Sequence, residues 1–258
     1  MRSGAKARRH PSRARPRFPR RAALAACVGL TVWAQAGSAD VTAAHFADET
    51  RRYPHGVLGD DVEYGTLVIE TGGAETPSEV IEVTLPETRV FEDLSPRLWD
   101  ITGNGAPEVI VVESDAQTGA QLAVYNAEGV KIAATPHIGQ RNRWLAPIGA
   151  ADLDGDGHIE VAYIDRPHLA KTLRIWRFQF GTLEEVASAP GLTNHLIGED
   201  FITSGMRECG QGPELITVNA AWTRVMASRL VEGAIESRDL GPFDKTEGLT
   251  AAMGCALP

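Results

Sequence analysis

The chain has little that points to a known catalytic chemistry. It lacks a Gly-x-Ser-x-Gly nucleophile elbow, a His-Glu-x-x-His zinc motif, a phosphate-binding loop and a dinucleotide fingerprint. Helical periodicity is weak after residue 39, and the apolar run near the N-terminus is too short to span a bilayer comfortably. These absences favour an all-β protein that is more readily a binding protein than an enzyme.

Basic residues are scarce outside the N-terminus. Residues 1–39 contain nine Lys and Arg and no Asp or Glu. Without that segment, 16 basic residues face 34 acidic ones, and the net charge is near −18. Such a charge argues against nucleic acid and anionic lipid surfaces as partners, and it agrees with cation binding.

The N-terminus has the order of a secretory leader. A basic stretch ends at Arg21, an apolar run covers 22–36, and small residues precede Asp40. We therefore expect a cleavable signal peptide at 1–39 and a mature domain at 40–258. The mature domain is expected in the periplasm or outside the cell, without membrane insertion after cleavage.

Cysteines are few, and each has a different context. Cys27 ends a lipobox-like Leu-Ala-Ala-Cys, but the apolar segment between Arg21 and this cysteine is too short, which disfavours a lipoprotein. Cys209 and Cys255 remain after cleavage. An even number of cysteines in an oxidising compartment predicts a disulfide between them.

Two acidic, glycine-rich loops stand 52 residues apart. The first reads DITGNGAPE at 100–108 and the second reads DLDGDGHIE at 152–160. Both place oxygen-bearing side chains at loop positions 1, 3, 5 and 9, with a backbone carbonyl available at position 7. Calcium takes six to eight oxygen ligands, which a turning loop of this kind can supply. The alternative is an ordinary Asx turn with no bound ion.

The loops belong to a longer internal repeat. Gly129, Gly181 and Gly233 are also spaced by 52, and each lies in a turn between two strand-like runs. A third copy keeps Glu214 after a proline but has no aspartate ladder, and two further strand-like runs lie at 65–70 and 79–85. Units of about 50 residues with three or four strands predict a β-propeller-like fold of about four blades. A β-sandwich or an open β-solenoid is the alternative.

The two loops, each followed by a β-type run, resemble the FG-GAP/VCBS-type repeat over roughly residues 90–240. In that family the loops bind calcium on the blades of a β-propeller, as in integrin α subunits, whose propellers have seven blades. The resemblance implies Ca²⁺ as the cofactor and the following ligands: Asp152, Asp154, Asp156, His158 (carbonyl) and Glu160, and Asp100, Thr102, Asn104, Ala106 (carbonyl) and Glu108.

An EF-hand or dockerin site shares the start of the second loop. Both need an acidic ligand at position 12 and flanking helices. Position 12 is Tyr163, inside a β-type run, so the sequence disfavours a helical calcium site.

Other polar residues leave a second function open. His168 follows Asp165-Arg166-Pro and could line a pocket or lie in a polar turn, His55 could pair with Asp60 or Asp61, and His195 is a further candidate. The preferred hypothesis is an exported, calcium-binding, non-enzymatic scaffold for an unidentified protein or glycan. The alternative is a propeller-fold hydrolase or lyase with structural calcium, which would bring His55, Arg166 and His168 to one mouth of the ring.

Overall fold

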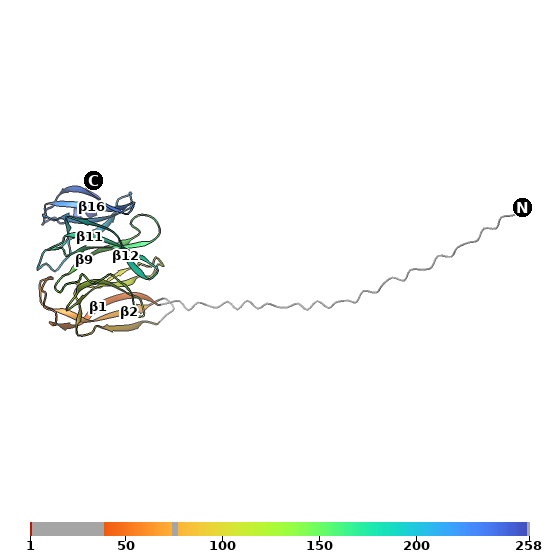
Figure 1. The fold of residues 1–258 in the computed structure, drawn as a ribbon, viewed down its shortest axis with the longest axis horizontal. Coiled ribbons are helices and arrows are strands. Elements are labelled where there is room, and N and C mark those ends of the chain that lie inside the picture. Colours follow the sequence, from red (N-terminus) through yellow and green to blue (C-terminus); the bar gives the residue numbers. More distant parts are fainter. Residues whose placement is uncertain (2–38, 74–76, 257–258) are drawn as a thin grey trace. The chain divides into compact units, whose positions relative to one another are not determined.

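Strands make up almost all of the regular structure, as predicted. The computed structural model describes residue 1, residues 39–73 and residues 77–256. The described residues from 39 onward form one compact unit (Figure 1). The signal peptide expected at 1–39 lies outside the described residues apart from its two ends.

The first two units share one antiparallel sheet of eight strands. Strands β1, β2 and β3 form the first unit, β4 joins β2 to β6, and β5 to β8 form the first complete four-stranded blade. The strands are β1 (Asp40–Thr50), β2 (Glu63–Gly72), β3 (Glu79–Thr84), β4 (Arg89–Phe91), β5 (Arg97–Trp99), β6 (Glu108–Asp115), β7 (Gly119–Tyr125) and β8 (Lys131–Ala134).

Two further blades follow in the same order. The second blade is a four-stranded meander with the order β12-β11-β10-β9, and the third joins β14 to β17 in the same way with a short β13 beside β15. The strands are β9 (Leu145–Ala151), β10 (Ile159–Asp165), β11 (Thr172–Gln179), β12 (Thr182–Pro190), β13 (Leu192–Thr193), β14 (Gly205–Glu208), β15 (Pro213–Asn219), β16 (Arg224–Val231) and β17 (Ala234–Pro242). The predicted propeller-like fold of about four blades is confirmed.

The first and second complete blades are apolar on both faces because each lies between two neighbours. In β6, Val109 and Val111 pack toward the first unit, whereas Ile110 and Val112 pack toward the second blade. This is the two-residue period of a strand, with both faces buried. The second blade repeats the pattern: β10 directs Tyr163 toward the first blade, and alternate residues of the same strand pack toward the third blade.

The last blade is covered by the C-terminal segment. A short helix, α1 (Thr250–Met253), places Ala252 against Ile216 and Leu240 on the outer face of this blade. Figure 1 shows β1 and β2 at one end of the compact unit and β16 at the other. The blades therefore form an open series, and a polypeptide cap covers the apolar face that ring closure would otherwise bury.

The repeated glycines occupy matching turns. Gly129, Gly181 and Gly233 have φ values of 72°, 75° and 77°, in the left-handed region that favours glycine. They connect β7 to β8, β11 to β12 and β16 to β17. The spacing of 52 residues thus reports the same hairpin in three successive blades.

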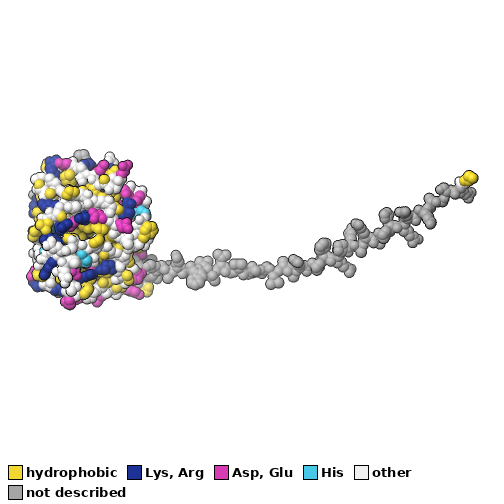
Figure 2. All heavy atoms as spheres, in the orientation of Figure 1, with side chains coloured by type: hydrophobic (Ala, Val, Ile, Leu, Met, Phe, Trp, Pro, Cys, Tyr) yellow, Lys and Arg dark blue, Asp and Glu magenta, His cyan; other side chains and the backbone are white. Residues whose placement is uncertain are grey.

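The surface carries charges of both signs. On the face shown in Figure 2, acidic and basic side chains are interspersed among apolar ones rather than separated by sign. Among the described residues, no helix is long and apolar enough to cross a membrane.

Candidate functional site

The loop at 152–160 joins β9 to β10 and is organised by its first carboxylate. Asp152 accepts hydrogen bonds from the backbone N–H groups of Gly155 (2.7 Å), Asp156 (3.1 Å) and Gly157 (3.0 Å). Gly155 and Gly157 have positive φ, which lets the backbone turn around this side chain. The loop is therefore folded tightly by its own hydrogen bonds.

The loop at 100–108 has the same construction between β5 and β6. Asp100 accepts hydrogen bonds from the N–H groups of Gly103 (2.8 Å), Asn104 (3.1 Å) and Gly105 (2.8 Å). These donors occupy the same loop positions as those around the first carboxylate of the other loop. The two loops are thus structural equivalents, as their spacing predicted.

The last carboxylate of each loop is buried beneath it. Glu160 accepts from Leu153 N at 2.9 Å, and Glu108 accepts from Ile101 N at 2.9 Å. Thr102 also donates its hydroxyl to Glu108 at 3.0 Å. Position 9 therefore ties each loop to the start of the following strand.

The two loops differ in how many acidic groups they bring together. Asp152, Asp154 and Asp156 each direct a carboxylate oxygen into a group whose ligand atoms all lie within 4.8 Å of one another. Among the described residues no other set of three or more acidic, histidine or cysteine side chains meets this condition. The loop at 100–108 offers Thr102 and Asn104 at the corresponding positions, so it is the less acidic cage.

A guanidinium group lies within the more acidic cage. Arg177 in β11 is the cross-strand partner of Glu160 and contacts its carboxylate at 2.6 Å. It also contacts Asp154 at 2.6 Å and Asp156 at 2.7 Å. Burial raises the pKa of Glu160, while the hydrogen bonds from Leu153 and Arg177 oppose that rise. The sequence analysis did not identify Arg177, which supplies positive charge to three of the five predicted ligands.

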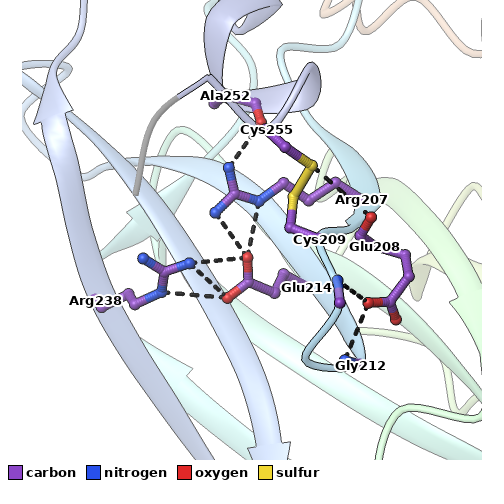
Figure 3. The surroundings of a disulfide bond; sticks show 9 residues. Arg207, Glu208, Cys209, Gly212, Glu214, Arg238, Ala252 and Cys255 are labelled. Atoms are coloured by element: carbon purple, nitrogen blue, oxygen red, sulfur yellow. Dashed lines mark hydrogen bonds and ion pairs between the residues drawn. A yellow bond between two sulfur atoms is a disulfide. The ribbon is translucent and has the colours of Figure 1, made fainter.

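The third repeat has a shorter version of the loop. Glu208 accepts hydrogen bonds from Gly210 N at 2.6 Å and Gly212 N at 3.1 Å, much as the first aspartate does in the other two loops (Figure 3). Glu214 binds Arg207 at 2.7 Å and Arg238 at 2.9 Å. Burial would raise the pKa of Glu214, but the hydrogen bonds from the two arginines outweigh burial and lower it. Arginine thus neutralises the last carboxylate in the second and third repeats.

The predicted disulfide is confirmed. Cys209 and Cys255 are bonded, with their Cα atoms 5.9 Å apart, and the bond joins the third loop to the segment after α1 (Figure 3). Arg207 donates to the carbonyl of Ala252 at 2.7 Å beside it. The disulfide and the buried arginine together hold the C-terminal cap on the last blade.

A cavity elsewhere brings together the histidines singled out in the sequence. It has a volume of about 260 Å³, and His55, Arg166 and His168 all line it. His195 lies behind His168, with 2.9 Å between its Nδ1 and the Nε2 of His168. The convergence expected for the enzymatic alternative is therefore present, although these residues are far apart in the sequence.

The carboxylate partner predicted for His55 is wrong. Its Nδ1 contacts Glu92, which is fully buried, rather than Asp60 or Asp61. Asp61 instead pairs with Arg51 at 2.6 Å. The sequence places Glu92 37 residues away from the histidine, and no local pattern links the two.

These observations define a protein of antiparallel β-blades whose inter-strand loops are organised by acidic residues. Residues 100–163 match the family model of the FG-GAP-like repeat, so this part of the chain is a repeat of FG-GAP type. The matched segment spans both acidic loops and the strands β6 to β9 between them.

Known proteins give no closer identification. No curated protein matches the chain. Among solved structures, the exotype rhamnogalacturonan lyase YesX aligns with a TM-score of 0.38 and 15% identity, over 70% of this chain. The rhamnogalacturonan lyase PL11 of Bacillus licheniformis aligns with a TM-score of 0.36 and 14% identity, over 73% of this chain. The chain spans 41% and 44% of those two proteins.

Proposed function

We propose that this protein is an exported calcium-binding repeat scaffold whose rigid blades present a surface to another protein or a glycan. The supporting observation is the oxygen cage formed by Asp152, Asp154 and Asp156, whose ligand atoms lie within 4.8 Å of one another. Carboxylate and carbonyl oxygens in a flexible loop are the donor set that calcium prefers. The signal peptide and the periplasmic or extracellular location belong to this proposal.

The donor set fits calcium at 152–160. The three aspartates, the carbonyl of His158 and Glu160 would hold the ion, and the ion would cross-link the loop to the start of β10. In the first loop, Asp100, Thr102, Asn104, the carbonyl of Ala106 and Glu108 would hold a second ion. With two carboxylates instead of four, the first loop is expected to bind calcium more weakly.

Thermal unfolding of residues 40–258 with calcium, and separately with EGTA, tests the proposal. Extracellular calcium modules have dissociation constants of roughly 10⁻⁴–10⁻³ M. At a tenfold excess over such a constant, one site adds about 1.4 kcal/mol to the free energy of unfolding. For a domain of this size that is a rise in Tm of about 3–6 °C.

The Asp154→Asn variant is expected to lose most of this rise. Asp200→Asn is the matched control, because Asp200 is an exposed carboxylate outside the loops. Sodium chloride at equal ionic strength separates specific binding from screening. A folded protein whose Tm is the same in calcium and in EGTA would show that the loops are Asx turns without an ion.

A hydrolase or lyase is the second candidate function, and the convergence of His55, Arg166 and His168 on one cavity favours it. It predicts that the protein releases reducing ends or unsaturated products from a polysaccharide panel. His168→Gln would abolish that release, whereas His45→Gln, which changes an exposed histidine in β1, would not. Absence of turnover in the folded protein would rule out the hydrolase or lyase and leave the scaffold proposal.

A further inference from the structure

The cavity that contains the histidines is built by loops from separate parts of the chain. His55 and Val57 precede β2, Arg143 precedes β9, His168 follows β10, and Ile197 follows β13. Its volume of about 260 Å³ is below the range for drug-sized ligands, roughly 300–1,000 Å³. A ligand the size of a monosaccharide fits such a space.

The hydrogen bonds behind His168 determine which of its nitrogens carries a proton. The Nε2 of His195 lies 2.9 Å from the carbonyl of Glu199, which can only accept, so this nitrogen carries a hydrogen. Burial lowers the pKa of His195, so its ring is neutral and its Nδ1 accepts a hydrogen bond from Nε2 of His168.

The second nitrogen of His168 is therefore a bare acceptor. Burial, followed by the charges of His195 and His55, lowers the pKa of His168 to about 4, so the ring is neutral at neutral pH. With its hydrogen on Nε2, its Nδ1 has a lone pair, and no group among the described residues donates to it. His168 thus offers a hydrogen-bond acceptor to the cavity.

His55 offers the opposite polarity. Its Nδ1 contacts the fully buried Glu92, whose other oxygen accepts from the hydroxyl of Ser114. Burial favours a histidine–carboxylate pair that is neutral overall. Burial raises the pKa of Glu92, and a protonated Glu92 carboxyl donates to Nδ1 of His55, which leaves the hydrogen of the ring on Nε2. The ring edge that faces away from Glu92 is therefore a donor.

The cavity also has a cation without an acidic partner. Arg166 is neutralised by Asp165, which it contacts at 2.8 and 2.9 Å. Arg143 donates to the carbonyl of Asn142 at 2.7 Å, and in the described part of the chain no carboxylate forms an ion pair with it. A guanidinium that has no carboxylate partner within the protein can bind the carboxylate of a ligand.

We propose that this cavity binds a hydroxy acid the size of a monosaccharide. Arg143 and Nε2 of His55 bind the carboxylate, and Nδ1 of His168 accepts a hydrogen bond from a hydroxyl group. Val57 and the exposed side chains of Leu169 and Ile197 at the rim contact the carbon skeleton. This site is separate from the calcium loops and requires no turnover.

Calorimetric titration with three probes of similar size tests the proposal. D-glucuronate has a carboxylate and hydroxyls, D-glucose has only hydroxyls, and cyclohexanecarboxylate has only the carboxylate. We expect glucuronate to bind at least tenfold more tightly than either of the others. Equal binding of glucuronate and glucose, equal binding of glucuronate and cyclohexanecarboxylate, or no binding of glucuronate would overturn the proposal.

Variants locate the binding groups. Arg143→Gln is expected to weaken glucuronate binding about tenfold, in line with a charge-assisted hydrogen bond of about 1.4 kcal/mol or more. His168→Gln should remove the preference for glucuronate over cyclohexanecarboxylate. Arg51→Gln, which changes an exposed arginine outside the cavity, is the control. Thermal unfolding of each variant shows that it is folded, and a folded Arg143→Gln that binds glucuronate as wild type does would contradict the assignment.

Discussion

Replacing Arg177 by glutamine is expected to lower the free energy of unfolding of the calcium-free protein by about 3 kcal/mol, the lower end of the cost of breaking a buried ion pair. Glu160 is fully buried and loses its charged partner, whereas Asp154 and Asp156 lie nearer the solvent and lose less. Urea unfolding in EGTA measures the difference. Without Arg177, an external cation would have to neutralise the carboxylates that the arginine neutralises in the native protein.

At the proposed calcium site, the same substitution should tighten binding of the ion. A unit charge about 4 Å from another contributes about 4 kcal/mol at an effective dielectric constant of 20, so removing Arg177 from the cage relieves a substantial repulsion of the ion. We expect the dissociation constant for calcium to fall by roughly a factor of ten or more. Calcium would then restore most of the stability that the variant loses in EGTA.

Arg224→Gln is the matched control, because Arg224 pairs with Asp239 on the exposed surface of the last blade. Surface pairs of this kind contribute little. If Arg177→Gln changed neither the stability in EGTA nor the calcium affinity, Arg177 would not neutralise the cage in solution.

The blades were predictable because their signals are local. Turn glycines with positive φ, alternating apolar residues and the first aspartate of each loop act within a few residues of themselves, and all recur at a spacing of 52. The pairing of Cys209 with Cys255 followed from the two cysteines that remain after the expected leader and from an oxidising compartment. Such features need no knowledge of how distant segments pack.

Arg177 could not be placed from the sequence because its position depends on strand register. Glu160 and Arg177 are cross-strand partners. Their pairing can be predicted only if the exact length of the connection between β10 and β11 is known. That connection contains Arg166 and Lys171 with positive φ, at 47° and 49°, which no turn motif in the sequence indicates. A one-residue error in the register would put the arginine on the opposite face of the sheet.

The carboxylate partner of His55 in the cavity was missed for a different reason. His55 and its carboxylate Glu92 lie 37 residues apart, and His168 comes from the second blade. The sequence shows only near neighbours, so Asp60 and Asp61 were the carboxylates considered. Their side chains have local roles, since Asp60 accepts a hydrogen bond from Val62 N at 2.9 Å.

The open series of blades explains why the C-terminal segment is needed. In a closed ring the outer face of the last blade would be buried by the first blade, but here α1 covers Ile216, Val225 and Leu240. Terminal repeats of stacked proteins need a capping segment, because each repeat buries its apolar face only against a neighbour. The disulfide from Cys255 to the third loop holds this cap in place.

Ending the chain after Gly248 should therefore lower the free energy of unfolding by about 6 kcal/mol. Loss of the disulfide accounts for about 4 kcal/mol in the chain-entropy model, for a loop closed by cysteines 46 residues apart. Loss of the contacts made by Leu249, Ala252 and Met253 accounts for about 2 kcal/mol more. Domains of this kind have a total stability of about 5–15 kcal/mol, so the truncated protein would be close to unfolding.

The exposed face should also cause self-association. Uncovered Ile216, Val225 and Leu240 form an apolar surface that a second copy can bury. The control is the full chain with Cys209→Ser and Cys255→Ser, which keeps α1 and loses only the covalent bond. Urea unfolding and sedimentation velocity should show this control as a monomer that is less stable than wild type by about 4 kcal/mol. If the truncated protein had the same stability as the control and were also a monomer, the disulfide and not the helix would protect the last blade.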